Sequence, residues 1–157
     1  MQRRSMLIGT AASAATLFGV MPAMAVNERG TRDEAVAMVD RALAQCRADG
    51  LDALIASVNA QDPRYVDRDL YVFVNTQKGI SVGHAANPAV VGNSLWEAKD
   101  PDGLLLVQKI VADVASGSPV WVDYKWPDPI TGRVRQKSSY CVLIDRDHHL
   151  GVGIYTD

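Results

Sequence analysis

After residue 30, the chain first places apolar residues with the period of an α-helix. A capping-box sequence, Thr31–Glu34, precedes this stretch, and Gly50 divides it into two parts. The apolar positions of the first part recur three or four residues apart: Val36, Val39, Leu43 and Cys46. A second apolar series runs from Leu51 to Val58. The pattern predicts a long helix that begins at Thr31 and a shorter helix that begins at Leu51.

From Leu70 onward, the pattern of apolar positions is typical of β-strands. Leu70–Val74 is rich in aromatic and β-branched residues, and a polar turn at Gln77–Gly79 leads from it to Ile80–His84, which predicts a hairpin. Similar segments predict three more strands, over residues 120–126, 136–145 and 151–155. Apolar residues at helical spacing over residues 102–116 predict a helix between the second and third strands.

The order of these elements indicates the fold class. Neighbouring strands are joined by short connections, which favours antiparallel pairing. Two helices, two strands, one helix and three strands fit the α+β class, with helices packed on an antiparallel five-stranded sheet. About 130 residues after the leader suit one domain with one core. We expect that domain over residues 31–157, after a short flexible lead-in over residues 26–30.

The N-terminus has the features of a secretory signal peptide. Arg3 and Arg4 precede an apolar run, Met6–Met21, that is too short to span a bilayer, and Ala23–Ala25 has the small-residue pattern of a cleavage site. We expect residues 1–25 to be removed after Ala25, which leaves the mature protein in the periplasm without insertion into the membrane. The paired arginines fit a twin-arginine signal and a general secretory signal equally well.

Charge and cysteine content restrict the kinds of partner and of covalent link. The chain has 16 basic and 18 acidic residues, and loss of the two leader arginines leaves 14 and 18, a net charge of −4. Nucleic acids and anionic membrane surfaces require concentrated Lys and Arg, so we expect neither as a partner. Cys46 lies in a predicted helix and Cys141 in a predicted strand, and we predict two free thiols rather than a disulfide.

Several motifs follow one another in the order of a known sensory family. They are Leu70–Val74, Gly83–His84, Asn87–Pro88, Val91–Gly92, Lys99–Gly103, Tyr124–Pro127, Lys137–Tyr140 and Gly151–Tyr155. Together they resemble the type 2 single Cache domains, and the resemblance runs from the first helix to Asp157. It implies a PAS-like antiparallel sheet with a long N-terminal helix and a covering helix. It also implies sensing of small ligands outside the cytoplasm, often of short organic acids.

The resemblance also implies a kind of partner. Such domains usually lie between the transmembrane helices of chemoreceptors and histidine kinases, so a membrane sensor kinase or a chemoreceptor is the expected class. We expect this chain to differ from that arrangement, with neither flanking membrane spans nor a signalling domain of its own. Direct transmission across a membrane is therefore not expected from the mature chain alone.

Six residues are candidates for a ligand site. Successive strand residues point to opposite faces, so Tyr124 and Trp126 share one face and Lys125 lies on the other. Lys137, in an otherwise apolar strand, can supply the positive charge that a buried carboxylate needs. A tyrosine hydroxyl and an imidazole N–H can complete such a site, and tryptophans can form its apolar walls. The candidates are His84, Tyr124, Trp126, Lys137, Tyr71 and Trp96.

Each candidate also fits a purely structural role. A lysine at the start of a strand can be solvated, His84 can be a hydrogen-bonded structural residue, and the aromatic residues can belong to the core. The adjoining His148 and His149 fall in a predicted turn, where we expect them to be solvated rather than to hold a metal.

The sequence favours ligand binding over catalysis. Neither cysteine has a metal-type partner at short spacing, and there is no G-x-S-x-G elbow or phosphate loop, so we predict no metal, no cofactor and no enzymatic activity. The leading hypothesis is a soluble periplasmic sensory domain that binds a small organic molecule, such as a short carboxylate, and signals through a partner. Two alternatives stay open: a small periplasmic enzyme that uses His84 and Lys137, and a structural adaptor with no working pocket.

Overall fold

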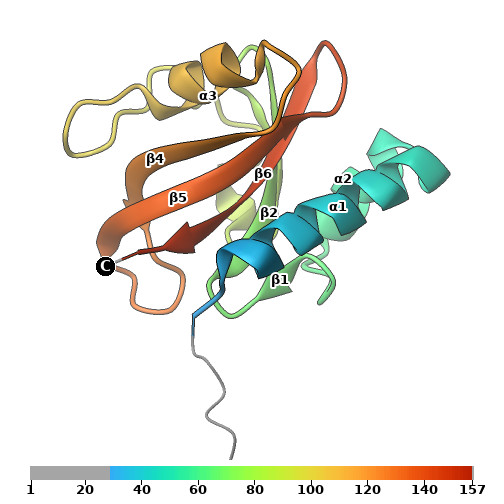
Figure 1. Cartoon of the computed structure of the whole chain (residues 1–157), viewed down its shortest axis with the longest axis horizontal. Helices are drawn as coiled ribbons and strands as arrows, with labels where there is room; N and C mark the ends of the chain where they lie inside the picture. The colour runs from blue at the N-terminus through green and yellow to red at the C-terminus, as the bar shows by residue number, and fades with distance from the viewer. Residues whose placement is uncertain (1–28, 157) are drawn as a thin grey trace, which may run out of the picture.

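The computed structural model describes residues 29–156, so the leader predicted over residues 1–25 lies outside it. Six antiparallel strands form one sheet in the order β1-β2-β6-β5-β4, and β3 also pairs with β2 (Figure 1). The strands are β1 (Val66–Asp67), β2 (Leu70–Thr76), β3 (Ser81–His84), β4 (Val120–Pro127), β5 (Val134–Leu143) and β6 (His148–Tyr155). The predicted α+β class and all five predicted strands are confirmed. The sixth strand, β1, has two residues, which is too short for a periodic pattern.

The helices also follow the prediction, with shifted ends. They are α1 (Arg32–Asp49), α2 (Leu51–Asn59) and α3 (Leu106–Val114), and a short 3₁₀ helix that was not predicted, η1 (Pro88–Val90), lies in the loop before α3. The capping box at the start of α1 is present, because the Thr31 hydroxyl accepts from the Glu34 amide and the Glu34 carboxylate accepts from the Thr31 amide. The residues that α1 buries are Ala35, Met38, Val39 and Ala42. Of the predicted apolar stripe, only Val39 is fully buried.

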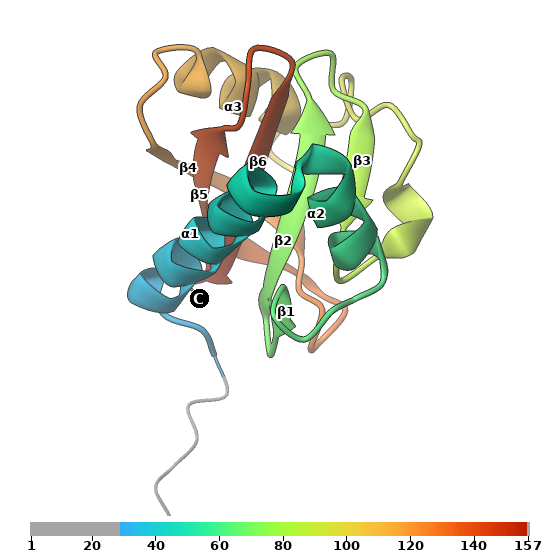
Figure 2. The ribbon, with the colours of Figure 1, turned by 90° about the vertical axis from the view of Figure 1, so that its right-hand side faces the viewer.

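The sheet separates two layers of helix. Figure 1 shows α3 on one side of the sheet and α1 with α2 on the other, and Figure 2 shows α1 and α2 lying over β2 and β6. The register pairs Tyr124 with Lys137 and Asp123 with Ser138, so these two pairs point to opposite faces. Arg32 of α1 donates to Ser138, and α3 packs over the face that carries Lys137. The predicted alternation along β4 is therefore confirmed.

Arg29 and Gly30, the last two residues of the lead-in expected over residues 26–30, contact two aspartates. Arg29 lies 2.7 Å from the Asp128 carboxylate and 3.5 Å from the Asp69 carboxylate, and the Gly30 amide donates to Asp69 at 2.6 Å. Both aspartate side chains are buried. Buried carboxylates need hydrogen-bond or ion-pair partners. For this reason the segment just before α1 is held against the β4–β5 loop and the β1–β2 turn.

The two cysteines lie on different sides of the sheet. Cys141 pairs with Gly151 and shares the face of Lys137, whereas Cys46 is on α1, which covers the opposite face. Neither thiol is bonded to the other. The sheet itself separates them, so a bridge would require rearrangement of the core.

Candidate functional site

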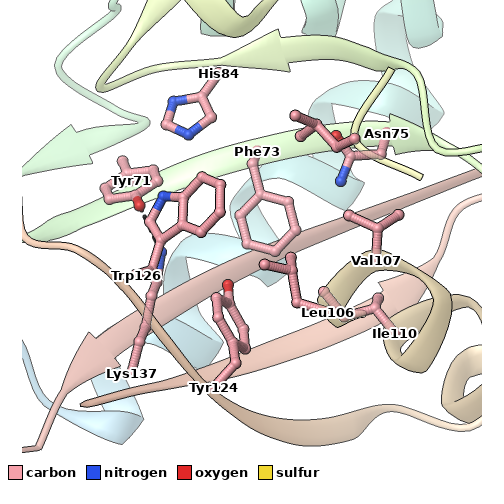
Figure 3. Close-up of a pocket in the computed structure, with 11 residues that line it drawn as sticks. Tyr71, Phe73, Asn75, His84, Leu106, Val107, Ile110, Tyr124, Trp126 and Lys137 are labelled. Atoms are coloured by element: carbon pink, nitrogen blue, oxygen red, sulfur yellow. Dashed lines mark hydrogen bonds between the residues drawn. The ribbon is translucent and has the colours of Figure 1, made fainter. Parts of the chain in front are cut away.

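A small cavity lies between the sheet and α3. Strands β2, β3, β4 and β5 and helix α3 all contribute to its walls, and its volume is about 20 Å³, room for about one water molecule (Figure 3). Its lining residues are Tyr71, Phe73, Asn75, His84, Leu95, Leu106, Val107, Ile110, Tyr124, Trp126 and Lys137. The wall is mostly apolar or aromatic, with a few polar side chains that point inward, which is the usual character of a ligand pocket.

The most unusual group in this wall is the Lys137 ammonium. The residue is 1 % exposed, and within residues 29–156 the single hydrogen bond of its ammonium is the one that Nζ donates to the Tyr71 hydroxyl at 2.6 Å. Nζ lies 3.9 Å from the centre of the Tyr71 ring, and the rings of Phe73, Tyr124 and Tyr155 surround it within 6 Å. Burial lowers the pKa of Lys137 to about 7. The described part of the chain thus surrounds a buried amine with aromatic rings and supplies no carboxylate to pair with it.

His84 offers a hydrogen-bond donor close to this amine. Its Nδ1 accepts from the Asn87 amide at 2.9 Å, and its ring stacks on Tyr71 with 4.8 Å between the ring centres. Burial, and then the charge of Lys137, lower the pKa of His84 to about 4, so the ring is neutral at pH 7. A neutral ring that accepts at Nδ1 carries its proton at Nε2. That N–H has no hydrogen bond to residues 29–156 and is available to a ligand.

Tyr124 and Trp126 form the wall contributed by β4. The Tyr124 hydroxyl shares a hydrogen bond with the Ser139 hydroxyl at 2.9 Å, and burial raises the pKa of Tyr124, so the hydroxyl stays protonated. The Trp126 ring packs edge-on against Tyr124 with 6.4 Å between the ring centres and is only half-buried. Trp126 is therefore the more exposed of the two residues in this wall.

Five of the six candidate residues from the sequence meet at the cavity, and Trp96 does not. His84, Tyr124, Trp126, Lys137 and Tyr71 all line it, and Figure 3 shows them gathered toward one end. The Trp96 ring instead packs against Gly79, and its neighbour Leu95 lines the cavity. The loop between β3 and α3 decides which of these two adjacent side chains turns inward, and strand alternation does not extend to a loop.

The remaining lining residues were missed. Phe73 and Asn75 share the face of Tyr71 on β2, so the alternation that selected Tyr71 could have found them. Leu106, Val107 and Ile110 had the apolar spacing of a core helix, and nothing else in the sequence indicated that they line a cavity.

The expectation that His149 is a solvated turn residue is wrong. Strand β6 begins at His148, three residues before the predicted start, and His149 is fully buried in it. His148 stays near the surface, where its ring contacts the Asp145 carboxylate. Among residues 29–156, no group of three or more His, Cys, Asp or Glu side chains is arranged to hold a metal ion.

A second, larger cavity adjoins the first. Its volume is about 250 Å³, and Tyr71, His84 and Trp126 line both cavities. The other walls of the second cavity come from residues 86–87 and from the loop over residues 127–132. The three shared side chains therefore separate the Lys137 cavity from a wider hollow.

Comparison with known proteins assigns the family. The sequence pattern of the Single Cache domain 2 family matches residues 6–157, nearly the whole chain. The chain belongs to the single Cache domain 2 family. A Cache chemosensory domain, solved in work titled "Structural basis for carboxylic acid recognition", has the same fold, with a TM-score of 0.62 at 23% identity over 80% of this chain and 88% of that one.

Two curated proteins contain segments similar to this Cache domain. The sensor histidine kinase MctS of Rhizobium johnstonii is 31% identical over 91 residues, which are 57% of this chain and 20% of the kinase. The methyl-accepting chemotaxis protein McpP of Pseudomonas putida is 30% identical over 92 residues, which are 58% of this chain and 17% of the chemoreceptor. The segments matched are thus a fifth or less of these proteins. None of the helices over residues 29–156 is long and apolar enough to cross a membrane.

Proposed function

We propose that this Cache domain is a periplasmic sensory domain that binds a small carboxylate at Lys137 and reports its presence to a partner protein. The observation that carries the proposal is the buried Lys137 ammonium, which has a single neutral hydrogen-bond partner within residues 29–156. A buried charge without a counter-ion is costly, and a bound anion removes that cost. A carboxylate ligand therefore supplies what the cavity lacks.

The groups around Lys137 suit a carboxylate better than a cation. The His84 Nε2–H and the indole N–H of Trp126 are donors. The Tyr71 hydroxyl donates instead to the Tyr155 hydroxyl at 3.3 Å, because Tyr155 uses its own proton on the Pro127 carbonyl. Charge-assisted hydrogen bonds from such donors to a carboxylate are about twice as strong as neutral ones. The similarity in fold to a domain solved for carboxylic acid recognition supports the same ligand class.

The small size of the cavity means that a bound carboxylate must change the shape of the domain. A volume of about 20 Å³ is too small even for acetate, so a bound carboxylate displaces at least one wall. Trp126 is half-buried and separates this cavity from the wider second one, so we infer that Trp126 swings to join the two. Such a movement of Trp126 would shift the β4–β5 loop, in which Asp128 accepts a hydrogen bond from Arg29. The position of the residues just before α1 would then depend on whether a ligand is bound.

The partner and the location follow from the relatives and from the N-terminus. Similar segments occur in a sensor histidine kinase and in a chemoreceptor, so we propose a membrane protein of one of these two classes as the partner. The leader pattern that ends at Ala25 supports export to the periplasm. The mass of the intact protein recovered from the periplasm tests this, and an uncleaved chain would contradict it.

The decisive experiment measures binding of acetate, propionate and pyruvate by thermal shift and by titration calorimetry. A ligand that binds only the folded state adds RT ln(1 + [L]/Kd) to its stability, so at least one of these acids should raise the melting temperature. Lys137→Met keeps most of the packing and removes the charge. Loss of one partner of a buried charged pair costs about 2 to 5 kcal/mol, so affinity should fall at least about thirtyfold.

Two matched lysines provide the controls. Lys125 is on the opposite face of β4 and pairs with Asp102, and Lys109 is on the outer side of α3 and pairs with Asp113. Lys125→Met and Lys109→Met should leave affinity nearly unchanged. Binding that survives Lys137→Met but not Lys125→Met would overturn the assigned site. Turnover of a bound acid would favour the enzyme alternative, and no binding of any acid would favour the adaptor.

A further inference from the structure

A row of polar side chains crosses the sheet at the end of the cavity away from Lys137. The register pairs Asn75 with Ser81 on β3 and with His149 on β6, so three adjacent strands each place one polar residue in this row. Ser81 and His149 are 0 % exposed and Asn75 is 4 % exposed. Polar side chains in such a position are expected to be fully hydrogen-bonded, because an unpaired buried polar group is costly.

This row is not fully hydrogen-bonded. The hydroxyl oxygen of Ser81 and Nδ1 of His149 are buried without a hydrogen-bond partner in residues 29–156. The one hydrogen bond within the row joins Asn75 Nδ2 and His149 Nε2 at 3.4 Å, which is long. Burial lowers the pKa of His149 to about 4, so its ring is neutral at pH 7. Because Nδ2 of Asn75 can only donate, this bond leaves the carbonyl oxygen of Asn75 free to accept.

Asn75 opens into the same cavity as Lys137. Figure 3 shows Lys137 and Tyr71 toward one end, Asn75 at the other, and Phe73 between them. Tyr71 and Asn75 are four residues apart on β2, which corresponds to about 13 Å between their Cα atoms. Leu106 and Val107 of α3 also line the cavity, and Figure 3 shows Val107 toward the Asn75 end. An elongated ligand that extends along β2 would thus meet a cation, an apolar middle and a neutral polar group in turn.

We propose that Asn75, supported by His149, forms a second, uncharged subsite that binds a hydroxyl group at the far end of a carboxylate ligand. This inference rests on the proposed function, because Lys137 holds the carboxylate. The ligand hydroxyl donates to the free carbonyl oxygen of Asn75, and its methylene chain lies between Phe73 and α3. Side chains of α3 such as Val107 move outward to admit the chain, because the cavity of about 20 Å³ has no room for it as it stands. Among residues 29–156 no cation lines the Asn75 end of the cavity, so a second carboxylate there would be desolvated without compensation. The ligand class is short monocarboxylates with a terminal hydroxyl, and dicarboxylates are disfavoured.

Titration calorimetry with matched ligand pairs tests the subsite. The pairs are butanoate with 4-hydroxybutanoate, pentanoate with 5-hydroxypentanoate, and hexanoate with 6-hydroxyhexanoate. At least one hydroxy acid should bind about fivefold or more tightly than its parent acid, as one added buried hydrogen bond predicts. Asn75→Leu should abolish that preference and leave acetate affinity within about twofold of wild type. Asn93→Ala, in the exposed loop after η1, is the control and should keep the preference.

A measurement without ligand separates a binding role from a structural one. Ser81→Ala removes a hydroxyl that has no hydrogen-bond partner in the described part of the chain and should leave the melting temperature unchanged or raise it, whereas a structural hydroxyl would lower it on removal. If Asn75→Leu does not fold, Asn75→Ala takes its place. Equal affinity for parent and hydroxy acids, or an equal loss of both in the Asn75 variant, overturns the subsite and leaves the carboxylate site standing. If no monocarboxylate binds the wild type, both proposals are overturned.

Discussion

The side chain of Lys137 on β5 lies across Gly153 on the neighbouring strand β6. A Cβ atom at position 153 would overlap Cε of Lys137 and the hydroxyl oxygen of Ser139. Gly151, two residues earlier on the same face, leaves room in the same way for the Phe73 ring. The two glycines of β6 thus provide the space in which a lysine and an aromatic ring are buried side by side. Elsewhere in a strand, glycine would only weaken the sheet.

Replacement of Gly153 by alanine should therefore displace Lys137. Overpacking of a buried site costs about 1 to 3 kcal/mol, which urea unfolding would measure. Carboxylate affinity should fall at least about tenfold in calorimetry, because the ammonium no longer reaches its position beside Tyr71. Gly83→Ala on β3 is the control, since its nearest neighbour, a methyl group of Val58, would be 3.3 Å away. Wild-type affinity in Gly153→Ala would show that the position of Lys137 is not critical.

Carboxylate affinity should depend on pH near neutrality. The ligand anion binds the protonated form of Lys137, whose pKa burial lowers to about 7. From pH 6 to pH 8 the protonated fraction of the free protein falls about tenfold, and the apparent affinity should fall with it. Titration calorimetry in buffers of different ionisation enthalpy should also detect proton uptake on binding at pH 8. A constant affinity over this range would mean that Lys137 keeps an ordinary pKa.

Mild acid should destabilise the fold through two buried histidines. Burial lowers the pKa values of His84 and His149 from 6.5 to about 4, so the unfolded state binds more protons than the folded state between these values. The contribution of these two histidines to the free energy of unfolding is therefore complete above pH 6.5. It is lost as pH falls toward 4, by about 2 kcal/mol for each histidine at pH 5. Urea unfolding at pH 7 and pH 5 measures the loss. His149→Leu should lose about half as much between these two pH values, and an equal loss would exclude His149 as a cause.

Both cysteines should be free thiols of low reactivity. They lie on opposite faces of the sheet, and burial raises the pKa of Cys46 and raises that of Cys141 to about 12. Thiol counting under denaturing, non-reducing conditions should find two thiols per chain. In the folded protein, half-buried Cys46 should react with a thiol reagent before buried Cys141. A monomer with no free thiols would contradict the layer arrangement described above.

The sequence by itself determined the order of the main helices and strands and, within each strand, which side chains share a face. Helical and strand periods differ, and a side chain's face in a regular strand depends only on whether its position is odd or even. For this reason Tyr124 and Trp126 could be assigned to one face of their strand before any contact was known, whereas the register between β4 and β5 is what places Lys137 on that same face. The capping box at Thr31 was predictable for the same reason, because its hydrogen bonds join residues three positions apart.

The tertiary structure alone decided which side chains outside the regular strands line the cavity or are buried against the sheet. Trp96 lies in a loop, where no period determines which side chain points inward, and packing against Gly79 turns it away from the cavity. His149 looked like a turn residue because the point where a turn ends and a strand begins depends on pairing with a distant strand. Here His149 pairs with Asn75 of β2, which the local sequence does not reveal. The anchoring of Arg29 likewise depends on Asp69 and Asp128, which folding brings together from separate turns. Local sequence carries information about local geometry, whereas burial results from contacts between segments far apart in the chain, and these form only when the sheet is assembled.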